Sequence, residues 1–89
     1  MKVNSKKENQ AALEKYKEHY KTGNYQKALI IIQPLAEKGD ARAQYNLGVH
    51  YELGQGVEQN DDLAAAWYRK AAEQGDSGAQ HNLACLYLA

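Results

Sequence analysis

Two stretches of this chain, LAEKGDARAQYNLGVHYEL at residues 35–53 and AAEQGDSGAQHNLACLYLA at residues 71–89, are versions of one sequence. They are offset by 36 residues, and nine of their 19 paired positions are identical. The identical pairs are Ala36/Ala72, Glu37/Glu73, Gly39/Gly75, Asp40/Asp76, Ala43/Ala79, Gln44/Gln80, Asn46/Asn82, Leu47/Leu83 and Tyr51/Tyr87. A fixed period of this size indicates an array of stacked supersecondary units, each of which needs a neighbour to bury its apolar face.

Composition narrows the class of protein further. The chain has 89 residues, of which 44% are hydrophobic and 25% charged, and its formal net charge is zero. One ordinary domain fits this length, and the absence of a basic excess argues against a nucleic acid or an anionic membrane as partner. A single cysteine excludes an internal disulfide, and the polar N-terminus lacks the apolar run of a signal peptide. With no apolar segment long enough to span a bilayer, we expect a cytoplasmic protein, the alternative being a periplasmic or secreted one from which a leader has been removed.

The spacing of apolar residues predicts five helices. Recurrence at three- and four-residue steps is typical of one buried helical face, with charged residues on the other. The expected helices cover residues 7–22, 25–38, 41–53, 61–74 and 77 onward. Leu29 to Ile32 alone would suit a strand, but the apolar pattern continues at helical spacing beyond it. Pro34 lies inside the second helix, where its ring is expected to cause a kink.

Polar and glycine residues mark the helix ends. Gly23, Gly39 and Gly75 each stand just past an expected helix, where a left-handed residue is needed. The residues expected to cap the following helices are Asn24, Asp40, Asn60 and Asp76. Ala79, Leu83 and Tyr87 are expected to be buried in the last helix, as their counterparts are in the third.

A family resemblance rests on the middle of the chain. The residues that carry it are Ala43, Leu47, Gly48, Tyr51, Gly54, Gly56 and Val57, followed by Ala64, Trp67, Tyr68, Lys70, Ala71, Ala72 and Gly75. At these spacings the chain resembles the Sel-one-like repeat, a relative of the tetratricopeptide repeat. Residues 1–7 are expected to be a flexible N-terminus, and residues 8–39 resemble a tetratricopeptide-like helix pair. Residues 40–75 resemble one complete Sel-one-like unit, and residues 76–89 the first helix of a further repeat or a cap.

The resemblance implies an all-α superhelix made of two antiparallel helix pairs and one terminal helix. It also implies a scaffold or adaptor without catalytic residues that binds a peptide or helix of a partner protein, often in bacterial regulation. The concave face is implied to carry the partner site, at Tyr45, Asn46, Val49, Glu52, His81 and Asn82. Lys15, Glu18 and Lys21 of the first helix are expected nearby. The alternative for Asn46 and Asn82 is that they satisfy backbone groups at turns between helices.

The last helix raises a second possibility. No partner for its far side is found in this sequence, so Cys85, Leu86 and Leu88 are expected to be exposed. Either the chain is a fragment of a longer array, or these residues form an oligomer surface, with a homodimer as one result. A self-associating assembly piece is therefore the alternative function. We expect neither a metal nor a cofactor, since His19, His50 and His81 are scattered and Cys85 lacks a CxxC partner.

Overall fold

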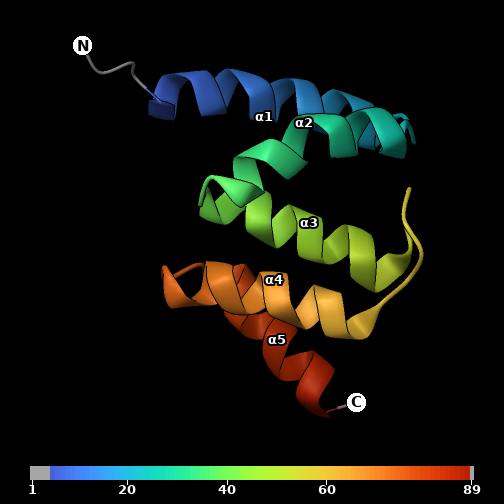
Figure 1. Ribbon diagram of the computed structural model, residues 1–89, viewed down its shortest axis with the longest axis vertical. Helices are drawn as coiled ribbons and strands as arrows, with labels where there is room; N and C mark the ends of the chain where they lie inside the picture. The colour runs from blue at the N-terminus through green and yellow to red at the C-terminus, as the bar shows by residue number, and fades with distance from the viewer. Residues whose placement is uncertain (1–4, 89) are drawn as a thin grey trace.

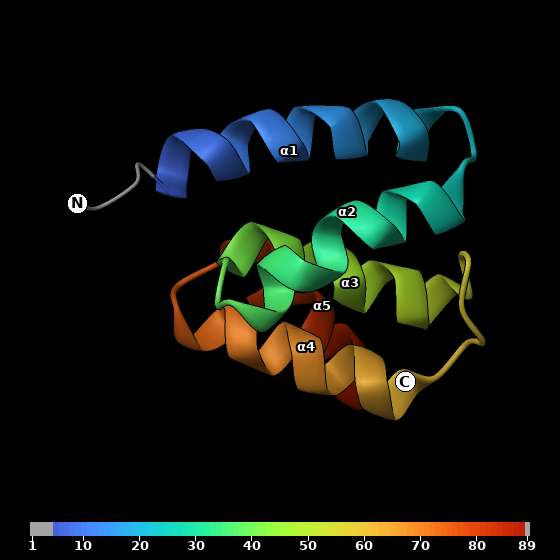
Figure 2. The ribbon, with the colours of Figure 1, turned by 45° about the horizontal axis from the view of Figure 1, so that its top comes forward.

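The computed structural model describes residues 5–88, with side chains from residue 7 onward, and these residues form five α-helices. The helices are α1 (Ser5–Lys21), α2 (Tyr25–Glu37), α3 (Ala41–Leu53), α4 (Asp61–Glu73) and α5 (Ser77–Leu88). Each packs mainly on its neighbours in the sequence, and the chain reverses direction between successive helices (Figure 1). The result is an elongated stack of 44 × 28 × 16 Å, seen from a second direction in Figure 2. The predicted all-α superhelix is confirmed.

The helix bounds lie close to those expected from the sequence. The third helix has the predicted bounds, and α2 and α4 each end one residue earlier. The first helix begins at Ser5 instead of residue 7, so the end of the segment expected to be flexible is helical. The rest of that segment, residues 1–4, lies outside the described residues.

Side-chain caps start three of the helices, and one predicted cap is wrong. The carboxylates of Asp40 and Asp76 accept the backbone N–H of Ala43 and Ala79, and the Asn60 amide oxygen accepts that of Leu63. Asn24 makes no such bond to α2, and its amide N–H donates to the hydroxyl of Thr22 at 3.3 Å. Its backbone has φ −82° and ψ 66°, whereas the capping residues Asp40 and Asn60 are extended, the conformation that lets a side-chain oxygen reach the first turn of the helix.

The proline in α2 bends the helix without ending it. Pro34 lies inside a helix that continues to Glu37. Figure 1 shows α2 changing direction along its length, between its teal and green parts. The missing N–H and the bulk of the ring account for the bend at this site.

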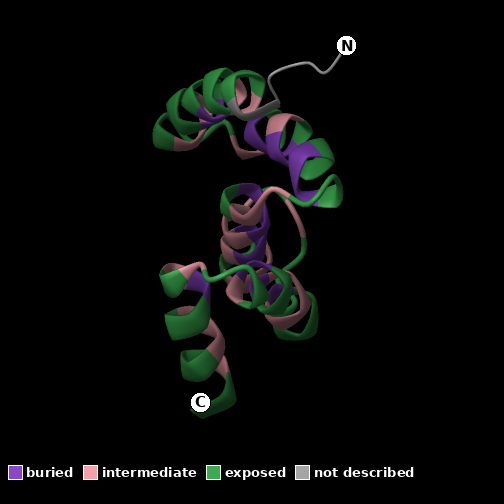
Figure 3. Cartoon of the chain, turned by 90° about the vertical axis from the view of Figure 1, so that its left-hand side faces the viewer, coloured by how far each residue is buried: buried purple, intermediate pink, exposed green. Residues whose placement is uncertain are grey.

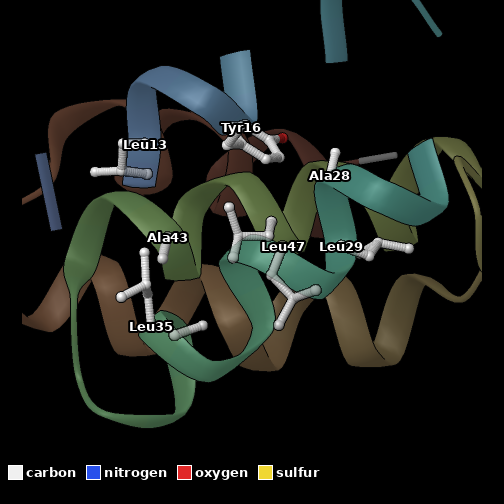
Figure 4. Close-up of a cluster of buried hydrophobic side chains, with 9 residues drawn as sticks. Leu13, Tyr16, Ala28, Leu29, Leu35, Ala43 and Leu47 are labelled. Atoms are coloured by element: carbon white, nitrogen blue, oxygen red, sulfur yellow. The ribbon is translucent and has the colours of Figure 1, made fainter. Parts of the chain in front are cut away.

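The apolar core consists of two clusters that meet at α3. The first joins α1, α2 and α3, and its buried members are Leu13, Tyr16, Ala28, Leu29, Ile32, Leu35, Ala36, Ala43 and Leu47 (Figure 4). All five α2 residues of this cluster were expected to be buried. The second joins α3, α4 and α5 around buried Ala64, Tyr68, Ala71 and Ala79. Most of α5, next to the C-terminus in Figure 3, is exposed or half-buried.

A glycine allows α3 and α4 to approach closely. Gly48 is buried, and a Cβ added there would lie 2.6 Å from two atoms of the Tyr68 ring. The ring is itself fully buried, so it fills the space that the missing side chain leaves. The 36-residue equivalent of Gly48 is Ala84, which is exposed because no described helix covers that face of α5.

Two expectations for α5 are wrong. Tyr87 is 63% exposed instead of buried, whereas its counterpart Tyr51 packs against both core clusters. The difference arises because α3 lies between two neighbours and α5, among the described helices, packs on α4. Leu86 was expected to be exposed but is half-buried against the second cluster. Its counterpart His50 is fully buried, so the repeat itself indicates an inward position.

We predict that Gly48→Ala destabilises the protein. The new methyl group must displace the buried Tyr68 ring, and overpacking of this kind typically costs about 1–3 kcal/mol. The free energy of unfolding, from urea denaturation, measures the effect. In a Tyr68→Leu background the cost should shrink, because the ring that clashes is gone. Unchanged or increased stability of Gly48→Ala in the unmodified chain would contradict the close approach.

Candidate functional site

Two adjoining hollows lie along the junction of α1 and α3. The first, here called the aromatic hollow, has a volume of about 290 Å³ and is lined by Tyr16, Lys17, Tyr20, Tyr45, Asn46 and Val49. The second, the polar hollow, has a volume of about 220 Å³ and is lined by Gln10, Leu13, Lys17, Arg42, Tyr45, Asn46 and Asp76. They share Lys17, Tyr45 and Asn46, so they form one continuous groove. Three of the predicted site residues, Tyr45, Asn46 and Val49, are therefore brought together.

The contribution of α1 to the groove differs from the expected one. Lys15 lines neither hollow, and Glu18 and Lys21 line a separate surface near the α1–α2 turn. Lys17 takes the place expected for them. Helical geometry explains this: residue 17 lies about 40° around the axis from buried Leu13, whereas residue 15 lies about 160° away, on the far side.

Glu52 and Asn82, also predicted for the partner site, are joined to each other through a buried tyrosine. The Tyr68 hydroxyl donates a hydrogen bond to Glu52 Oε1 at 2.7 Å and accepts one from Asn82 Nδ2 at 3.3 Å. Burial raises the pKa of Tyr68 well above its usual range, and the Glu52 carboxylate raises it further. The hydroxyl therefore stays protonated, and these three side chains connect α3, α4 and α5.

Glutamines, rather than asparagines, satisfy backbone groups at the turns between helices. Gln44 is buried and donates to the carbonyl oxygen of Ala36 at 3.1 Å. Its repeat counterpart Gln80 donates to that of Ala72 at 3.2 Å. The sequence signal for this role was that glutamine recurs at both positions, 36 residues apart. Asn46 instead lies in the groove, where it faces both hollows.

A buried histidine lies between α1 and the loop after α3. His50 is fully buried, its Nδ1 lies 2.7 Å from the carbonyl oxygen of Gln55, and its Nε2 lies 2.9 Å from the Tyr16 hydroxyl. Since a carbonyl oxygen only accepts, we assign the ring proton to Nδ1, and Nε2 then accepts from Tyr16. Burial lowers the pKa of His50, and the hydrogen bond to Gln55 offsets part of that effect. Sequence reasoning missed this role, because both partners are set by the fold.

His81 and Cys85 lie outside the groove, on the exposed part of α5. Their Nε2 and Sγ atoms are 3.6 Å apart, one helical turn from each other. Within residues 7–88, no three His, Cys, Asp or Glu side chains gather in a way that could hold a metal ion. The described helices also include none that combines the length and apolar character needed to cross a membrane.

Comparison with known proteins agrees with this architecture. The Sel1 repeat matches residues 41–76 and again residues 77–89, which together make up more than half of the chain. The chain belongs to the Sel1 repeat family. The first matched Sel1 repeat contains α3 and α4, and the second contains α5. The resemblance recognised in the sequence is therefore confirmed.

A curated relative of this Sel1 repeat chain is the ERAD-associated E3 ubiquitin-protein ligase component HRD3 of Candida glabrata. The two are 40% identical over 55 residues, which is 62% of this chain. The same match spans only 7% of the length of the relative. No solved structure matches the chain. The expected bacterial setting stays a prediction.

The His50 site predicts how stability depends on pH. A folded-state pKa below the unfolded value of about 6.5 means that the unfolded chain binds the proton more readily. The contribution of neutral His50 to folding stability is therefore complete above about pH 6.5 and is lost as the pH falls below that value. Urea denaturation between neutral and mildly acidic pH measures this loss. His50→Leu, which introduces the residue found at the equivalent position 86, should abolish it.

The same variant should be less stable than the unmodified protein at neutral pH. His50→Leu leaves the Tyr16 hydroxyl and the Gln55 carbonyl without their partner, a change worth about 1–3 kcal/mol. His81→Gln is the matched control, because His81 is exposed, and it should preserve the pH dependence of the unmodified protein. A pH dependence that persists unchanged in His50→Leu would show that another group causes it.

Proposed function

We propose that this chain is a non-catalytic protein-interaction module that binds a segment of a partner protein in the groove between α1 and α3. The observation that carries the proposal is the groove itself, which is continuous and lined by tyrosines from both helices. Tyrosine suits recognition because one side chain offers a large apolar face and a polar edge. Sel1 repeat membership supports a protein-interaction role in general terms, since arrays of helical repeats present extended binding surfaces.

The predicted site residues fall into two groups with different surroundings, and this difference supports the choice of this groove. Glu52 and Asn82 are engaged with Tyr68 inside the stack, which favours a structural role for both. Tyr45, Asn46 and Val49 are half-buried and line the hollows. Partner binding would bury these side chains further, and interface energy usually comes from a few such anchors. The HRD3 relative, by its name a component of a larger ligase, is in keeping with a module that contacts other proteins. We also propose a cytoplasmic location.

The groove proposal predicts that Tyr45→Ala combined with Asn46→Ala strongly reduces capture of partner proteins from a lysate of the source cells. Removing the central aromatic anchor and the amide from both hollows should reduce affinity by tenfold or more, roughly 1.4 kcal/mol. A pull-down with quantitative mass spectrometry measures the loss, and circular dichroism checks that the helices remain.

A second variant guards against a folding defect, because the Tyr45 ring also packs near Tyr68 and Gly78. Asn46→Arg places bulk and charge in both hollows and leaves every aromatic contact intact. It should lose the same partners. Partners that bind equally well to both groove variants would locate the interaction elsewhere.

Self-association through α5 is the second candidate function. Leu88 is 87% exposed and Tyr87 63% exposed, and Cys85 is exposed on the same helix. Neighbouring exposed apolar side chains can form a patch of the kind found where proteins meet, whereas single exposed ones, such as Ile30, are common. Leu86 is removed from the predicted oligomer surface, because it packs against the second core cluster.

This alternative predicts that the chain forms oligomers whose population rises with concentration and that Leu88→Glu prevents them. A charge at the most exposed apolar position would oppose burial of the α5 surface. Multi-angle light scattering over a concentration series measures the mass. Leu88→Glu should keep the groove partners, which separates the two functions. A strict monomer at every concentration would rule out the alternative.

A further inference from the structure

The two hollows of the groove differ in chemistry. The aromatic hollow is surrounded by the rings of Tyr16, Tyr20 and Tyr45 and by the Val49 side chain. The polar hollow shares Lys17, Tyr45 and Asn46 with it and adds Gln10, Arg42 and Asp76 together with the apolar Leu13. Because the hollows adjoin, a bound segment would meet apolar surface in both and the further charged side chains in the polar hollow.

The charged side chains around the groove differ in whether they already have partners within the described part of the chain. Arg42 donates to Gln10 at 2.7 Å and pairs with Asp40 at 3.3 Å. Asp76 uses Oδ1 to accept the backbone N–H of Ala79 at 2.8 Å. Lys17 borders both hollows and makes no ion pair within the described part of the chain. Among the lining side chains, Lys17 and Arg42 are positive and Asp76 is negative. Arg42 is paired with Asp40, so Lys17 is the exposed positive charge that borders both hollows, whereas Asp76 borders only the polar hollow.

We propose that the groove recognises an acidic partner segment, in which an Asp or Glu side chain pairs with Lys17 and an adjacent aromatic or aliphatic side chain fills the aromatic hollow. The inference rests on the proposed function and adds the chemistry of the ligand. Burial of the apolar side chain among the tyrosines supplies affinity, and the carboxylate sets the register of the segment. Asn46 lies at the same boundary and can donate to the carboxylate or to the peptide backbone.

Electrostatics decides between acidic and basic partners. A carboxylate that enters the groove can pair with Lys17. The negative Asp76, at the edge of the polar hollow, already accepts a hydrogen bond from a backbone N–H at the N-terminus of α5. A basic segment would meet the positive Lys17 in both hollows, whereas the charge of Arg42 is offset by Asp40. Like charges brought together at an interface are a common source of discrimination between partners.

The test begins with a library of short random peptides displayed on phage and selected against the full chain. Enriched peptides should carry Asp or Glu next to an aromatic or aliphatic residue. One such peptide is then synthesised with its acidic residue intact, neutralised to the amide, or replaced by Lys. Fluorescence anisotropy measures the affinity of each form for the unmodified chain, for Lys17→Glu and for Lys15→Glu.

Charge reversal gives the decisive comparison. Lys17→Glu should weaken the acidic peptide roughly tenfold or more, because it replaces an attraction by a repulsion. Lys15→Glu changes the net charge of the chain equally but lies outside both hollows, so it should change the affinity by less than about twofold. The peptide with Lys in place of its acid should recover affinity for Lys17→Glu.

The experiment distinguishes failure of the acidic preference from failure of the groove as the binding site. In one case, the selected peptides lose binding to Asn46→Arg, but their affinity changes neither with Lys17→Glu nor with replacement of their own acidic residue. The acidic preference is then overturned while the groove remains the site. If the peptides bind Asn46→Arg as well as the unmodified chain, the proposed groove function fails as well. A selection that enriches basic peptides overturns the acidic preference directly, and one that enriches none counts against both.

Discussion

The contact between Tyr68 and Gly48 holds the central part of the stack together. The ring occupies the space left by the missing side chain of α3, and the hydroxyl bonds Glu52 of α3 and Asn82 of α5. One side chain of α4 thus combines close packing with the satisfaction of polar groups from the helices on either side. Burial of a hydroxyl is favourable only when its hydrogen bonds are made, so the positions of α3 and α5 depend on each other through this residue.

The groove follows from the stacking and belongs to no single repeat. Its walls come from α1 and α3, which are separated in sequence by the whole of α2, and Tyr16, one of the residues that line it, is hydrogen-bonded to buried His50. Tyr45 and Asn46 are held in place because other residues of α3, Ala43 and Leu47, are packed in the core. Binding surfaces built in this way lose little side-chain freedom when a partner arrives, which favours affinity.

The two copies of the repeat agree at their helix caps and at the glutamines of their turns, and they differ at other positions, both buried and exposed. Asp40 and Asp76 cap their helices alike, and Gln44 and Gln80 bond equivalent carbonyl oxygens. At the variable positions, the groove residues Tyr45 and Val49 of α3 become His81 and Cys85 on α5, both of which are exposed. Equivalent backbone positions therefore carry different surfaces, and buried positions such as Gly48 and His50 also differ from their counterparts Ala84 and Leu86, because the neighbouring helices differ.

The sequence alone determined the number of helices, their bounds to within one or two residues, the caps at Asp40, Asn60 and Asp76, and the family, because periodicity and capping act over a few neighbouring residues. It also placed Tyr45, Asn46 and Val49 together, since they share one face of α3. Only the tertiary structure decided that the face of α1 carrying Lys17 lies opposite α3, that His50 bonds Tyr16, and that Tyr87 is exposed. Each of these depends on which helix lies opposite and at what rotation, and contacts between different helices set that arrangement.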